Sequence, residues 1–61
     1  MLSPREADVV SRIASGMKYQ EIADDLDLSL ETVKTYAARI RRKLNLRSKT
    51  DIAVWAVKQG I

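Results

Sequence analysis

The chain has 61 residues, so it holds one small domain at most, and without cysteine or histidine it has no disulfide and lacks the usual structural zinc ligands. Its 11 basic and 8 acidic residues give a net charge of +3. No apolar run approaches the roughly 20 residues of a membrane-spanning helix, and no charged-then-apolar leader opens the chain. We expect a cytoplasmic domain that is held together by packing, with no membrane segment, signal peptide, metal or cofactor.

The first expected helix begins after Ser3, which can cap it. Pro4 occupies the first helical position, and Glu6 completes a Ser-x-x-Glu capping box. Gly16 ends the helix, since glycine accepts the left-handed conformation. Apolar residues recur at helical spacing and form a core stripe: Val9, Val10, Ile13, Ala14 and Met17.

A second, short helix is expected over about 18–26. Asp24 and Asp25 lie near its end, where acidic side chains oppose the helix dipole, so we expect this helix to depend on packing. Asp27 and Leu28 form the turn that follows, because aspartate tolerates a left-handed position. The side chains that face inward are Ile22, Ala23 and Leu26.

The third helix is the longest, from Ser29 as its cap to Leu44 or Asn45. At about 100° per residue, its core-facing stripe consists of Val33, Ala37, Ile40 and Leu44, with Tyr36 on one flank. The opposite face has no large apolar group; it carries Glu31, Thr35, Ala38, Arg39 and Arg42, with Lys34 at one side.

The fourth helix is expected over about 49–59, with Ser48 and Asp51 as a second capping box and Gly60 after its end. The residues expected to close the core are Ile52, Ala53, Ala56 and Val57. A second face carries Asp51, Val54, Trp55 and Lys58, and large apolar groups on such a face usually mark a partner surface. The sequence therefore predicts a homodimer through this helix, weak in isolation.

Charge is segregated along the chain. Residues 1–31 carry three basic and seven acidic side chains, whereas residues 32–61 carry eight basic and one acidic. A basic run alone is more typical of a solvated helix face. A short helix, a tight turn and a longer basic helix together form a helix-turn-helix, whose second helix enters the DNA major groove. The small, polar first turns suit base edges, and the arginines farther along suit phosphates.

Several segments, in order and over nearly the whole chain, resemble the LuxR-type (NarL/FixJ-type) DNA-binding domain. They are Leu2-Ser3-Pro4-Arg5-Glu6, Ile13-Ala14-Ser15-Gly16, Glu21-Ile22-Ala23, the run from Ser29 to Thr35, Arg42-Lys43-Leu44 and Arg47-Ser48-Lys49. The resemblance implies an all-α, four-helix domain over residues 1–61, with a helix-turn-helix at about 18–45 and a C-terminal dimerisation helix. It also implies a transcription regulator that binds paired half-sites as a dimer, with this module following a receiver or ligand-binding domain.

The resemblance also assigns roles to residues of the third helix. It places Lys34, Thr35 and Ala38 against the bases, and Thr32, Tyr36 and Lys43 at or near the DNA backbone. Arg39 and Arg42 join the backbone set by their place on the exposed face.

This chain departs from the family pattern at four positions. Lys18 and Tyr19 stand where serine or threonine and asparagine are common, so the second helix lacks its usual cap and Glu21 is expected to lack its box partner. Glycine is common at Asp27 and histidine at Tyr36, although a tyrosine hydroxyl can still donate to phosphate.

Two other functions are weighed against this one. Tyr19 to Ala23 and Arg39 to Leu44 also resemble region four of a bacterial sigma factor, which usually ends soon after its recognition helix, whereas this chain adds a full helix. A protein-interaction module without a DNA role is the second alternative, and RNA polymerase stays open as a partner. An enzyme is not expected, since no nucleophile–base pair of the usual kinds or phosphate loop is present.

Overall fold

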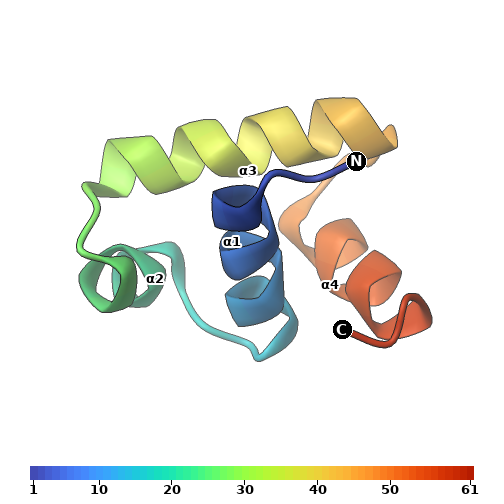
Figure 1. Ribbon diagram of the computed structural model, residues 1–61, viewed down its shortest axis with the longest axis horizontal. Coiled ribbons are helices and arrows are strands. Elements are labelled where there is room, and N and C mark those ends of the chain that lie inside the picture. The colour runs from blue at the N-terminus through green and yellow to red at the C-terminus, as the bar shows by residue number, and fades with distance from the viewer.

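The computed structural model describes all 61 residues and contains four helices and no strand. These are α1 (Pro4–Ala14), α2 (Tyr19–Leu26), α3 (Leu30–Leu44) and α4 (Lys49–Lys58). The expected all-α, four-helix class is confirmed. Figure 1 shows α3 running along one side of the molecule, with α1, α2 and α4 gathered on the other. No helix has the length and apolar character needed to cross a membrane.

Hydrogen bonds at the helix starts explain where the helices begin. The predicted box at α1 is confirmed: the Glu6 amide donates to Ser3 Oγ at 3.2 Å, and the Ser3 amide donates to Glu6 Oε1 at 2.8 Å. At α3, Ser29 Oγ accepts from the Thr32 amide at 3.1 Å. These bonds satisfy backbone donors that the first turn of a helix would otherwise leave free.

The start of α2 differs from the expectation that Glu21 has no box partner. No side chain caps this helix, as expected. However, Glu21 Oε1 accepts a hydrogen bond from the Lys18 amide at 2.7 Å, so the expectation that Glu21 has no partner is wrong. This half of a capping box needs only the backbone N–H of the cap residue, which lysine supplies as well as serine. At the other end of α2, Asp27 adopts the expected left-handed conformation, with φ of 56°.

The start of α4 also forms only part of the predicted box. Ser48 Oγ accepts from the Asp51 amide at 3.1 Å, as expected. However, the Asp51 carboxylate accepts from the amide of Arg47 at 3.0 Å, one residue before the cap. The carboxylate therefore fixes the entry of the chain into α4.

The core lies between all four helices. Its buried apolar residues are Val9, Val10, Ile13, Ile22, Ala23, Val33, Ala37, Ile40, Ile52 and Ala56. The α4 assignment needs a correction, because Val57 is 67% exposed and does not close the core. Trp55, expected on the outward face, is half-buried and packs against the core. The buried arc of α4 is centred between Ile52 and Ala56, which turns Trp55 inward and Val57 outward.

Candidate nucleic-acid interface

The outward face of α3 carries its polar and basic side chains. Because Val33, Ala37 and Ile40 are fully buried on the inner side, the rotation of the helix about its axis is fixed. The side chains this rotation exposes include Lys34, Thr35, Arg39 and Arg42, with Thr32, Tyr36 and Ala38 partly exposed. No other helix covers this side of α3 (Figure 1).

The first turns of this face hold only local polar contacts. Thr35 Oγ1 donates to the Glu31 carbonyl at 3.0 Å, and Lys34 Nζ lies 3.9 Å from Glu31 Oε1. Both members of this ion pair are exposed. Exposed pairs contribute little free energy, so Lys34 can exchange Glu31 for another acceptor at small cost.

The second half of α3 presents cations that have no partner in the chain. The four ion pairs of the structure join Arg5 to Asp8, Arg12 to Asp25, Lys34 to Glu31 and Lys43 to Glu6. Arg39, Arg41 and Arg42 take part in none of them. Guanidinium groups without internal acceptors are suited to bind phosphates, because their N–H donors fit the geometry of the anion.

Lys43 occupies a different environment from these arginines. Its Nζ lies 2.7 Å from Glu6 Oε1, and the Glu6 side chain is almost completely buried. The hydrogen bond from Lys43 and that from the Ser3 amide lower the pKa of Glu6 from 4.5 to about 2, against burial, which raises it. The buried carboxylate is thus held in its charged form by Lys43 of α3 and by Ser3, the residue that caps α1.

The outward face of α4 is apolar and hollowed. A shallow groove of about 300 Å³ is lined by Ala53, Val54, Val57 and Lys58. A second depression of about 160 Å³ adjoins it and is lined by Leu46, Asp51, Val54, Trp55 and Lys58. The side chains of Val54 and Val57 are 49% and 67% exposed, and neither Asp51 nor Lys58 forms an ion pair within the chain.

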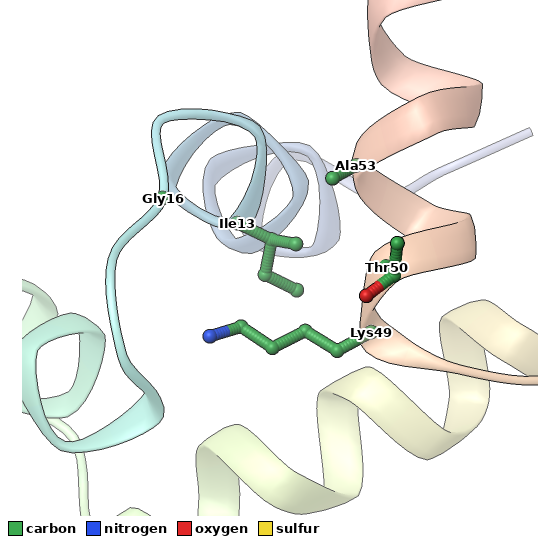
Figure 2. A pocket seen from close by; sticks show the side chains of 5 residues that line it. All are labelled: Ile13, Gly16, Lys49, Thr50 and Ala53. Carbon is green, nitrogen blue, oxygen red and sulfur yellow. The ribbon is translucent and has the colours of Figure 1, made fainter.

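A third depression, of about 210 Å³, lies where the end of α1 meets the start of α4 (Figure 2). Lys49 extends across it, and its ammonium lies 5.1 Å from the centre of the Tyr19 ring on α2. Ile13 and Ala53 supply an apolar floor and Thr50 a hydroxyl. This arrangement ties α4 to α2 by a cation–π contact. No group of three or more His, Cys, Asp or Glu side chains is placed to hold a metal ion.

The residues that the sequence singled out on α3 lie along its outward face or its flank, and those on α4 lie around its two depressions. Sequence reasoning missed two residues of these sites. Glu6 appeared only as a capping residue, and Val57 was assigned to the core. A burial signal for Glu6 was present, since it lies one helical turn before the buried pair Val9 and Val10.

Comparisons with known proteins show the family of the chain. A family model for bacterial regulatory proteins of the luxR family matches residues 1–56. The nitrate/nitrite response regulator protein NarL of Escherichia coli is 37% identical over 60 residues, and the oxygen regulatory protein NreC of Staphylococcus carnosus is 39% identical over 61. The response regulator GacA of Pseudomonas aeruginosa is 43% identical over 60 residues.

These alignments cover 98%, 100% and 98% of this chain, respectively, but only 28% of each relative, so the chain spans less than a third of their length. The expected LuxR-type resemblance is confirmed. The chain belongs to the luxR family of bacterial regulatory proteins, and it is a DNA-binding domain of that family.

Proposed function

We propose that residues 1–61 form the DNA-binding domain of a longer transcription regulator and that α3 reads the major groove of double-stranded DNA. The observation that carries this proposal is the outward face of α3, where unpaired arginines follow small polar first turns on a helix whose other side is buried. The proposed base-reading residues are Lys34, Thr35 and Ala38, and the proposed backbone contacts are Thr32, Tyr36, Arg39 and Arg42.

The chemistry of the first turns supports base reading. The Lys34 ammonium can donate to the guanine acceptors N7 and O6, and the methyl groups of Thr35 and Ala38 can meet a thymine methyl. Small side chains there let the helix backbone approach the base edges. Arg39 and Arg42 lie one to two turns farther along, where the groove turns away and phosphates come within reach.

A salt titration of DNA binding tests this proposal. If about four to six phosphates are neutralised per protomer, the logarithm of affinity falls against the logarithm of salt concentration with a slope of about −4 to −5. The measurement is fluorescence anisotropy on a labelled duplex at five salt concentrations, with a poly-anionic peptide as a control for non-specific attraction. A flat response on DNA would contradict the proposal and leave the protein-interaction module as the better function.

The relatives support a regulatory setting. NarL and GacA are named as response regulators, so we propose that the chain serves a two-component response regulator in the bacterial cytoplasm. RNA polymerase is a proposed second partner through the surface that DNA leaves free. A pull-down of purified polymerase, with and without operator DNA, tests that contact.

We further propose that α4 forms a homodimer interface. Val54 and Val57 are exposed around the apolar groove, and the half-buried Trp55 lines the adjoining depression with Leu46. Asp51 and Lys58 lie two turns apart and lack ion-pair partners within the chain. Two antiparallel copies of α4 related by a two-fold axis would place each Asp51 opposite the other copy's Lys58.

One short helix per side buries less than about 1,200 Å² in total, so the isolated domain is expected to be monomeric at micromolar concentration and to pair on DNA. Val54→Asp should abolish cooperative binding to a duplex with two half-sites and spare binding to one half-site. Ser11→Asp, which also introduces an aspartate at an exposed position but on α1, is the control and should leave cooperativity intact. Unchanged cooperativity in Val54→Asp, with an unaltered helical spectrum, would remove α4 as the interface.

A further inference from the structure

The last turn of α3 is tied to α1 by a single ion pair. Lys43 Nζ lies 2.7 Å from Glu6 Oε1, and the same Glu6 oxygen accepts from the Ser3 amide at 2.8 Å. Lys43 Nζ also lies 3.5 Å from the carbonyl oxygen of Met1. Of the four ion pairs in the chain, this is the one that joins α3 to another helix. The chain start lies beside this end of α3 in Figure 1.

The two members of the pair differ sharply in exposure. The Glu6 residue is 3% exposed, whereas the Lys43 side chain is about half exposed. A buried carboxylate that loses its cation keeps the full cost of its desolvation, which is why breaking such a pair is strongly unfavourable. Lys43 therefore cannot turn toward a DNA phosphate without leaving the buried Glu6 carboxylate with no cation and only the Ser3 amide as a donor.

Arg42, one residue before Lys43, has no ion-pair partner within the chain. It is exposed, has no acceptor within the chain and is free to bind phosphate. At about 100° per residue, the side chains of Arg42 and Lys43 leave α3 in clearly different directions. The adjacent cations of this turn thus have separate environments, one open to solvent and one held against α1.

The burial of apolar residues on the inner side of α3 explains why its last turn needs the ion pair with Glu6. The fully buried stripe ends at Ile40, and the next core-facing residue, Leu44, is only half-buried. Less apolar burial anchors the turn that carries Arg42 than anchors the turns before it. An ion pair with a buried carboxylate supplies a directional contact that fixes the rotation of this turn.

We infer that Lys43 is a positioning residue for DNA binding, which acts through Glu6 to hold the last turn of α3, and that it is not one of the phosphate contacts. This inference rests on the proposed function of α3 in binding DNA. It replaces the expectation from the sequence that Lys43 lies at the DNA backbone. The phosphate contacts of this turn are then made by Arg42, with Arg39 one turn earlier.

The test compares Lys43→Met with Arg42→Met, its neighbour on the same turn. Both changes remove one positive charge and keep a long side chain. Two further variants are Lys43→Arg, which preserves a cation for Glu6, and Glu6→Gln/Lys43→Met, which removes both charges and keeps the domain folded if Lys43→Met alone unfolds it. Urea unfolding gives the folded fraction of each, and fluorescence anisotropy gives DNA affinity at five salt concentrations.

The expected result is a different signature for each cation. Arg42→Met should make the salt slope shallower by about one, with an unchanged urea midpoint. Lys43→Met and the double variant should keep the wild-type slope. After correction for the folded fraction, Lys43→Met should bind about 3–10-fold more weakly than wild type, roughly the effect of a displaced contact worth about 1 kcal/mol. Lys43→Arg should restore that affinity.

Two results would overturn the inference. A slope made shallower by about one in Lys43→Met or in the double variant would show a direct phosphate contact. An unchanged slope together with wild-type affinity of the folded fraction would show that the pair acts on stability alone. If neither the wild type nor Arg42→Met shows any salt dependence, the proposed DNA binding by α3 itself has failed.

Discussion

The helices α3 and α4 each bury one side, and we propose a partner for the other side of each. Their sequences specify which side is buried to very different degrees. On α3 the buried apolar residues form one stripe, and small, polar and charged residues occupy the opposite face. On α4 six consecutive residues from Ile52 to Val57 are apolar, so apolar side chains surround the helix. A single apolar stripe specifies one rotation of a helix, whereas the sequence of α4 alone does not single one out.

The packing partners decide the rotation of α4. Ile52 and Ala56 are fully buried, and Trp55 fills the space beside them because a large side chain gains more from burial than a valine does. Val57 is then left outside, where it widens the apolar groove with Val54. Val57, which does not pack in the core, thus becomes part of the proposed dimer surface.

The largest expected effect separates these two sides of α4. Ile52→Ala removes a fully buried side chain and should lower the free energy of unfolding by about 2–5 kcal/mol. Val57→Ala removes an exposed one and should change that free energy by less than about 0.5 kcal/mol. Urea unfolding followed by circular dichroism at low protein concentration measures both. Equal losses from the two variants would mean that α4 is rotated away from the position described.

Acid should weaken the ion pair that joins the last turn of α3 to α1. The pKa of Glu6 is lowered from 4.5 to about 2, so the pair with Lys43 stabilises the fold fully above about pH 4.5. Its contribution declines as the pH falls from there toward 2, because the unfolded chain takes up the proton first. At pH 6 the free energy of unfolding should therefore be larger for wild type than for Glu6→Gln. This gap between the two proteins should close as the pH falls toward 2.5.

Urea unfolding at pH 6, 4.5, 3.5 and 2.5 measures this gap. The comparison with Glu6→Gln removes the background from the other carboxylates, which both proteins share. A gap that stays constant across this range would show that the Glu6 pKa is not lowered in the folded state.

The parts of this molecule that could be predicted are those fixed by local chemistry. The box of Ser3 and Glu6, the left-handed Asp27 and the buried stripe of α3 depend on neighbours within one or two turns. The parts that could not be predicted depend on distant contacts. Lys43 meets Glu6 across 37 positions of sequence, and Trp55 turns inward because of the space that the other helices leave.

The smallest expected effect compares the two ends of α3 with each other. Lys34 lies in the first turns and holds only an exposed ion pair, so Lys34→Ala should weaken binding to the preferred duplex by about 1–3 kcal/mol and relax the preference at one or two base pairs. Arg42→Ala should weaken binding to all sequences alike and make the salt slope shallower by about one. Selection from a pool of random duplexes measures the sequence preference of each variant, and salt titration on the selected duplexes measures the slope. If Arg42→Ala changed the selected sequence and Lys34→Ala did not, then α3 would enter the groove with its C-terminal half, and the base-reading set would move from Lys34, Thr35 and Ala38 to the arginines.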